Sequence, residues 1–201
     1  NAVNLLDGMD GLAGGFAAIA ALFMGIYGVI LGQWLMVLLS FALFGGLLSF
    51  LVFNFPPARI FMGDSGSLFI GFVLAIIPVA ANGNKDLHLE LAPTITLCML
   101  PVLDTAAAIF RRIIRRVPIS TPDREHIHHK LLDLGFSQVK ILIILYSASA
   151  LLGIATLLWA YLNPNGAALL HIGVWLTGLF LLLLLNRKIK VRRSSSQNIA
   201  S

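Results

Sequence analysis

The sequence predicts an all-α, polytopic integral membrane protein with about six transmembrane helices and a cytoplasmic loop helix. Of its 201 residues, 58% are hydrophobic and only 11% are charged, against roughly 25% charged in an ordinary soluble domain. The mean hydropathy is +0.91, and one soluble core of this composition would leave almost no polar surface to meet water. Several apolar runs also approach the roughly 20 residues that cross a bilayer core about 30 Å thick.

Six apolar runs are candidate membrane spans, and the third is short unless it begins near Gly63. Only Gly32 and Gln33 separate the first two runs, so we expect a tight antiparallel hairpin there. Pro101 is expected to loosen the fourth span, because proline removes a backbone hydrogen bond inside a helix. The six runs are Leu12–Leu31, Trp34–Phe55, Ser67–Ala81, Leu91–Phe110, Val139–Leu162 and Ala168–Leu185.

The basic residues predict which ends of the spans face the cytoplasm. Six crossings place 1–11, 56–66, 111–138 and 186–201 on one side. These segments hold every Lys and Arg except Lys140, which lies just inside a helix end beside them, and Lys85, which lies on the other side. By the positive-inside rule the side that holds these segments is the cytoplasmic side of the plasma (inner) membrane. The surplus of basic residues therefore marks loops and gives no reason to expect a nucleic-acid partner. Cys98 is the lone cysteine, which excludes an internal disulfide and a cysteine-based zinc site.

The domain organisation follows from the same pattern. Residues 1–186 form the expected transmembrane catalytic domain, including the cytoplasmic loop 111–138, and 187–201 form a basic tail expected to be disordered. The chain opens on Asn1 directly inside a dense polar motif, so we expect it to be the C-terminal part of a longer protein.

The first polar motif supplies two carboxylates. Asp7 and Asp10 are three residues apart, so both lie on one face if the segment is the first turn of a helix, with Asn4 one turn earlier. Gly8 and Gly11 leave the backbone bare for close approach of a ligand or a neighbouring helix. The alternative is that the carboxylates only complement the dipole of the following helix.

Two further carboxylates lie near helix ends. Asp64 stands between Gly63 and Gly66 at the mouth of the third span, where backbone N–H groups suit phosphate oxygens but a carboxylate repels them unless a cation intervenes. This pattern favours Mg²⁺, which is commonly held by one or two carboxylates together with waters and phosphates. The alternative is simple helix capping. Asp104, about 10 Å along the fourth span from Arg111, is either a site residue or an acidic partner of Arg111 or of a neighbouring helix.

The segment Thr121–Leu134 predicts a short amphipathic helix, capped by Thr121, with Pro122 in its first turn and Gly135 after its end. On such a helix His126 and His129 share a face and His128 points away, which argues against a three-histidine zinc site. Arg124 and the histidines then suit phosphate or sugar binding. The alternative is an ordinary solvated basic face.

Four motifs in this order resemble the polyprenyl-phosphate N-acetylhexosamine-1-phosphate transferases of glycosyltransferase family 4, the MraY/WecA family. They are Asn-x-x-Asn-x-x-Asp-Gly-x-Asp-Gly-Leu (1–12), Phe-Met-Gly-Asp-Ser-Gly-Ser (61–67), Pro-x-x-Asp-Thr (101–105) and Asp-Arg-x-His-Ile-His-His (123–129). The histidine pattern and the aspartate of Pro-x-x-Asp-Thr are more similar to the WecA/TagO branch. An acidic Asp-Asp motif that the family carries on an earlier loop does not occur in this chain.

The resemblance implies a Mg²⁺-dependent transfer, with Mn²⁺ as the other metal choice. N-acetylhexosamine-1-phosphate, most simply GlcNAc-1-phosphate, would pass from a UDP-sugar to undecaprenyl phosphate with release of UMP, at the start of a cell-wall or surface polysaccharide. Homodimer formation is left open. The alternatives are a membrane transporter and the UDP-MurNAc-pentapeptide branch of the same family. The implied catalytic residues are Asp7, Asp10 and Asp64, with Asp64 and Asp7 on the metal; the implied substrate-binding residues are Asn1, Asn4, Phe61, Arg124, His126, His128 and His129.

Overall fold

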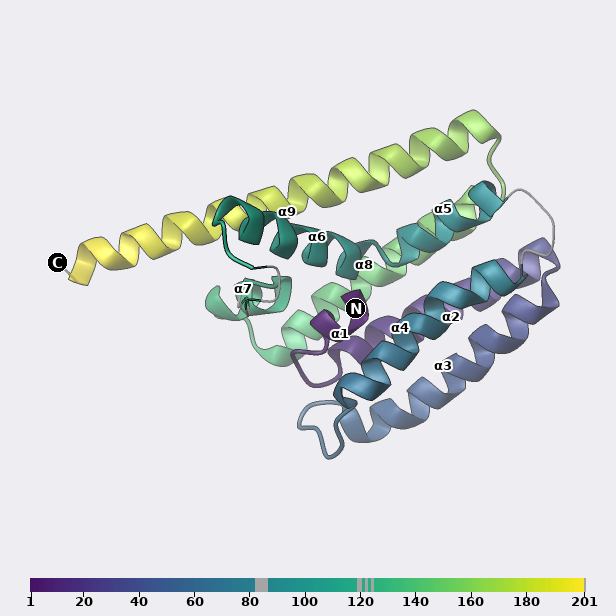
Figure 1. Ribbon diagram of the computed structural model, residues 1–201, viewed down its shortest axis with the longest axis horizontal. Helices are drawn as coiled ribbons and strands as arrows, with labels where there is room; N and C mark the ends of the chain where they lie inside the picture. The colour runs from purple at the N-terminus through teal and green to yellow at the C-terminus, as the bar shows by residue number, and fades with distance from the viewer. Residues whose placement is uncertain (82–86, 119–120, 122, 124, 201) are drawn as a thin grey trace.

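The computed structural model describes residues 1–81, 87–118, 121, 123 and 125–200, and over these residues the fold is entirely helical (Figure 1). Five helices are long and apolar enough to cross a membrane, and the number reaches the expected six if the bent pair α5–α6 is one span. The helices are α1 (Ala2–Leu6), α2 (Leu12–Leu31), α3 (Trp34–Asn54), α4 (Gly63–Ala81), α5 (Leu87–Leu97), α6 (Met99–Ile114), α7 (Ile127–Asp133), α8 (Gln138–Trp159) and α9 (Pro164–Ala200).

The core is built around α2, the most buried of the spans. It forms the expected hairpin with α3, because Gly32 adopts a left-handed conformation (φ +69°) that ends α2 and lets the chain reverse at once. On its other side α2 packs against α8, where Gly153 leaves room for the ring of Phe23. Small and fully buried side chains such as Ala17 and Ala21 bring these helices close together.

The fourth predicted span is not one straight helix, and its bend lies ahead of Pro101, which was expected to loosen it. Helix α5 ends at Leu97 and α6 begins at Met99, with a bend of 75° between them. Pro101 lies in the first turn of α6, where its missing N–H costs no intrahelical hydrogen bond. The bend invalidates the depth of about 10 Å estimated for Asp104, because that estimate assumed a straight helix.

Helix α9 corrects the expectation of a disordered tail. It continues through the basic segment to Ala200, so 187–200 are helical and only 201 lies outside the described residues. Arg, Lys, Gln and Ala have good helix propensity, so a membrane helix can extend past the lipid without a break. In Figure 1 this last part of α9 projects beyond the other helices.

The loop helix α7 is shorter than predicted. It begins at Ile127 with His126 as its N-cap residue, and Thr121 does not cap it. Two carboxylates explain the late start. The Asp123 carboxylate accepts a hydrogen bond from the backbone N–H of Glu125 (2.9 Å), which forms a turn there, and Asp104 accepts from the N–H of Ile127 (3.0 Å). Gly135 (φ +83°) follows the helix end as expected, whereas Pro122 lies outside the described residues.

Candidate active site

The first two motifs meet through a direct hydrogen-bond cluster. The Asn4 amide lies 3.0 Å from Asp64 Oδ1, to which it donates, and 3.0 Å from the hydroxyl of Ser67. Ser67 is fully buried and also hydrogen-bonds the backbone carbonyls of Gly63 (3.0 Å) and Asp64 (3.2 Å) in the first turn of α4. Asn4 and Asp64 are 60 positions apart in the sequence. Their hydrogen bond therefore holds the Asp64 carboxylate beside the N-terminus of α4.

Asp7 joins this cluster and brings a second carboxylate. It follows α1 as its C-cap residue, and burial together with the nearby Asp64 charge raises the pKa of its carboxyl above the usual range. A pair of carboxylates that repel each other is the electrostatic setting that a divalent cation relieves. We call Asn4, Asp7, Asp64 and Ser67 the carboxylate cluster.

Asp7 and Asp10 do not lie on one helix, so the common helix face expected for them does not form. The segment is a short helix followed by a turn, and Gly11 takes a left-handed conformation (φ +76°) that starts α2. The Asp10 carboxylate accepts a hydrogen bond from the backbone N–H of Ala58 (3.1 Å) and so holds the 55–62 loop. Helical spacing does not apply across a glycine turn.

Two residues that the sequence analysis did not single out hold the same turn. Asn54 accepts from the N–H of Gly11 (3.0 Å) and donates to the carbonyl of Ile60 (2.8 Å), and the hydroxyl of Tyr146 donates to the Gly11 carbonyl. The available signal for Asn54 is a lone amide at the end of an otherwise apolar helix, where a buried polar group needs partners.

The donor set of the carboxylate cluster fits Mg²⁺ better than zinc. Within the described ranges no group of three or more His, Cys, Asp or Glu side chains could hold a metal ion, and zinc sites generally need three or four such ligands. Mg²⁺ keeps several waters and takes one or two carboxylates plus substrate phosphates. Asp7 and Asp64 supply that number.

The histidines of the fourth motif lie closer together than helical spacing predicts. The rings of His126 and His128 are parallel within 3° with centroids 6.0 Å apart, and His128 lies 4.2 Å from His129. The prediction that His128 points away from His126 is wrong, because His126 caps α7 in an extended conformation (φ −67°, ψ 156°) and is not part of the helix.

His128 links this motif to the first one. It is 1% exposed, and a Cβ at position 8 would lie 2.5 Å from its Nε2, so only glycine leaves space for the ring. Neither ring nitrogen of His128 has a hydrogen-bond partner within the part of the chain that the structure describes. Burial and the neighbouring His129 lower the pKa of His128 to about 4, so the ring is neutral at physiological pH.

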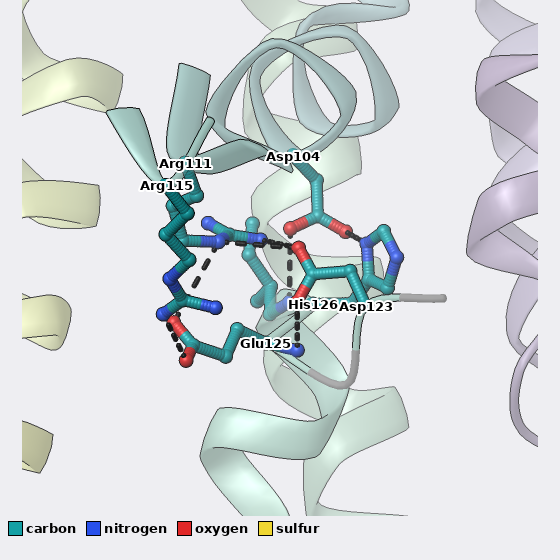
Figure 2. A network of polar contacts seen from close by, with 7 residues as sticks. Asp104, Arg111, Arg115, Asp123, Glu125 and His126 are labelled. Atoms are coloured by element: carbon teal, nitrogen blue, oxygen red, sulfur yellow. Dashed lines mark hydrogen bonds and ion pairs between the residues drawn. The ribbon is translucent and has the colours of Figure 1, made fainter. Parts of the chain in front are cut away.

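A polar network fixes α7 to the end of α6 (Figure 2). The buried Asp104 carboxylate accepts from His126 Nδ1 (2.9 Å) and from the Ile127 N–H (3.0 Å). Asp104 is therefore an acidic partner of the start of α7, which is one of the roles expected for it. Its partners are His126 and Ile127, not Arg111.

Three ion pairs complete what we call the α6–α7 network. Arg111 donates to Asp123 at 2.6 Å, and the more exposed Arg115 donates to Glu125 at 2.7 Å. Arg111 also lies 3.6 Å from Glu125. Burial alone would raise the pKa of Asp123, but its hydrogen bonds from Arg111 and the Glu125 backbone outweigh burial and lower it. The pKa of Glu125 is likewise lowered by Arg115 against the effect of burial. The Asp123 and Glu125 carboxylates are therefore ionised, and arginine side chains balance their charge.

Lys130 is the unexpected member of this region. It is 3% exposed, and its ammonium has no hydrogen-bond partner among the described residues. Burial and then the charge of Arg111 lower the pKa of its amine.

The remaining predicted substrate-binding residues have simpler surroundings. Asn1 is exposed and lines a cavity of about 350 Å³ between α1, α4, α5 and α6. Phe61 is 77% exposed, which leaves its ring free to stack on a planar group. Arg124 lies outside the described residues. The structure thus joins Asn4, Asp7 and Asp64, and brings His128 to the Asp7–Asp10 turn.

Comparisons of the sequence with a family model and with curated proteins point to the same family. Residues 1–82 match the family described as glycosyl transferase family 4. The chain is 38% identical over 146 residues to a probable undecaprenyl-phosphate N-acetylglucosaminyl 1-phosphate transferase of Bacillus subtilis, covering 73% of this chain and 41% of the relative.

Two further relatives carry related names. A decaprenyl-phosphate N-acetylglucosaminephosphotransferase of Mycobacterium leprae is 33% identical over 199 residues, covering 89% of this chain and 50% of the relative. An undecaprenyl-phosphate alpha-N-acetylglucosaminyl 1-phosphate transferase of Escherichia coli is 30% identical over 156 residues, covering 76% and 42%. The chain spans about half the length of the curated relatives that it matches or somewhat less.

Proposed function

The chain belongs to glycosyl transferase family 4, and we propose that it supplies a large part of the active site of a polyprenyl-phosphate N-acetylglucosamine-1-phosphate transferase. The donor would be UDP-N-acetylglucosamine and the acceptor undecaprenyl phosphate. The observation that carries the proposal is the Asn4–Asp64 hydrogen bond, because it joins two motifs of the family into one cluster at the end of the membrane helices.

The bond changes of this reaction balance without a redox step. An oxygen of the acceptor phosphate forms a bond to the phosphorus that carries the sugar, and the bond from that phosphorus to the UMP oxygen breaks. Both substrates are anionic at the reacting ends, so the site must offset phosphate repulsion and the charge on departing UMP.

The carboxylate cluster suits Mg²⁺, which Asp64 and Asp7 would hold. When bound, the metal supplies positive charge that offsets the phosphate oxygens. The chain's own contribution there is to position the ligands: Asn4 fixes one oxygen of Asp64, and the buried Ser67 fixes Asn4 in turn.

The histidine motif would serve the sugar and diphosphate side of the donor. Because His128 is neutral at physiological pH, it would offer one N–H donor and one lone pair, which suits a hydroxyl or acetamido group as well as a phosphate. Arg124 would add a cation, and the exposed ring of Phe61 would offer a stacking surface to uracil.

The lipid acceptor explains why the site lies at the end of a helical bundle. Its prenyl chain would stay in the apolar region while its phosphate reaches the carboxylate cluster. The charge asymmetry of the sequence supports placing this end at the cytoplasmic face of the plasma membrane, where a UDP-sugar would be supplied.

The test is Asp64→Asn in the full-length protein, with sugar-phosphate transfer from UDP-N-acetylglucosamine to undecaprenyl phosphate as the measurement. We expect a loss of about 10²–10³-fold, because the neutral amide would hold the cation less well and the cation is the group that offsets the developing charge. Asp133→Asn is the matched control, since Asp133 is an exposed carboxylate at the far end of α7. Near-normal turnover of Asp64→Asn would contradict the proposal.

A further inference from the structure

The Asp104–His126 contact in the α6–α7 network leads from α6 to the histidines beside the carboxylate cluster. Asp104 is 2% exposed and His126 is 6% exposed, so their 2.9 Å contact is shielded from water. A carboxylate can only accept at this position, which requires the proton of the imidazole to lie on Nδ1.

A carboxylate that accepts a hydrogen bond from one ring nitrogen of a histidine fixes both the ring orientation and the tautomer, as it does for metal-bound and catalytic histidines. Asp104 accepts a second hydrogen bond from the N–H of Ile127. It therefore holds the His126 ring and the backbone at the start of α7 at the same time (Figure 2).

His126 passes this constraint to His128. Their rings are parallel within 3° with centroids 6.0 Å apart, and His128 lies against the bare backbone of Gly8, next to Asp7. A continuous line of contacts thus runs from a buried carboxylate on α6 to the turn that carries the carboxylate cluster. Arg111 and Asp123 lie in the same network but contact no histidine ring through any hydrogen bond or ion pair described for them.

We propose that Asp104 is a positioning residue for the transfer reaction: it keeps the His126 proton on Nδ1 and, through His126, holds His128 over Gly8 beside the carboxylate cluster. The inference rests on the proposed function, since the positioned histidines matter only if a substrate binds there. Its geometric part, the tautomer and the ring positions, stands independently of any activity.

The informative variant is Asp104→Asn, because it keeps the size of the side chain. Its amide oxygen can still accept from the Ile127 N–H, so the start of α7 stays attached. Its amide nitrogen can only donate to His126 Nδ1, which moves the imidazole proton to Nε2. The matched control is Asp123→Asn, the same chemical change in the same network at a side chain that bonds Arg111 and a backbone N–H.

Two measurements on the full-length protein in lipid nanodiscs test the proposal. The first is ¹⁵N NMR of labelled histidines at about pH 8.5, where imidazole rings are neutral, with His126→Gln used to assign the signal. We expect Nδ1–H at His126 in the wild type, Nε2–H in Asp104→Asn, and Nδ1–H in Asp123→Asn. The second is the transfer rate, expected to fall about 10- to 100-fold in Asp104→Asn while the unfolding temperature changes little.

The outcomes separate the inference from the proposed function. A wild-type His126 protonated at Nε2, or an unchanged tautomer in Asp104→Asn, would overturn the inference whatever the enzyme does. An inverted tautomer with an undiminished transfer rate would overturn the positioning role. If the wild type shows no transferase activity, the proposed function fails and the positioning role fails with it, while the NMR result still decides the geometry.

Discussion

The two groups of carboxylates at this end of the molecule are opposites. In the α6–α7 network Asp123 is bonded by a guanidinium and a backbone amide, and its pKa is lowered. In the carboxylate cluster Asp7 faces another carboxylate, and its pKa is raised. The first arrangement holds two elements together, whereas the second leaves negative charge uncompensated. The contrast shows that the carboxylates of these motifs have two kinds of role. A carboxylate paired with a guanidinium and a backbone N–H holds the structure together, whereas one beside another carboxylate is available to a cationic ligand.

The contact of Gly8 with His128 joins the turn that carries Asp7 to α7, and we expect a change there to have the largest effect. Gly8→Ala would push a methyl group against His128, because a Cβ there lies 2.5 Å from Nε2. We expect the transfer rate to fall about 10²-fold, as displacements near 1 Å can cost. Gly46→Ala on α3 is the control, since a Cβ there meets nothing within 4 Å. Equal rates for both variants would show that His128 need not lie over this turn.

The ion pairs that Arg111 and Arg115 make in the α6–α7 network should differ in strength. Arg111→Ala leaves the poorly exposed Asp123 carboxylate without its guanidinium partner, and we expect a loss of about 2 kcal/mol of stability. Arg115→Ala removes a pair in which Arg115 is largely exposed, worth under about 1 kcal/mol. Chemical denaturation of both variants in the same detergent measures the difference. A larger loss for Arg115→Ala would reverse this ranking.

The opposite pKa shifts predict opposite pH effects, measured without divalent metal. The raised pKa of Asp7 means that its contribution to stability falls as the pH rises above 3.8, so Asp7→Asn should be more stable than the wild type at neutral pH. The lowered pKa of Asp123 means that its contribution is lost on acidification, so Asp123→Asn should be less stable at neutral pH. Both differences should shrink toward about pH 3. Thermal unfolding that gives both variants the same sign at neutral pH would remove the distinction.

The fold was predictable from hydropathy because lipid imposes it. Runs of apolar residues predicted the spans and Gly32 predicted the hairpin, whereas the bend after Leu97 was not predicted, because it lies ahead of Pro101. The predictions that were wrong are those that assumed an unbroken helix through the polar motifs. Asp7 and Asp10 share no helix face because the chain turns between α1 and α2. His126 stacks on His128 because it caps α7 instead of lying inside it.

The partners of the site residues were harder to foresee, since they come from distant positions. No local pattern shows that Asp104 bonds His126 across 22 positions, or that Tyr146 reaches Gly11 across 135. Spacing identifies which residues carry chemistry. Only the packing of α1, α4, α6 and α7 shows which of them are already paired.

The most direct test of this distinction is the effect of Mg²⁺ on thermal unfolding of the wild type, Asp64→Asn and Asp123→Asn. A ligand that binds only the folded state stabilises it by RT ln(1 + [L]/Kd). If Asp7 and Asp64 hold the cation, Mg²⁺ should raise the unfolding temperature of the wild type and of Asp123→Asn, and should leave Asp64→Asn unchanged. An equal Mg²⁺-dependent rise in all three proteins would contradict the assignment of the carboxylate cluster as the metal site.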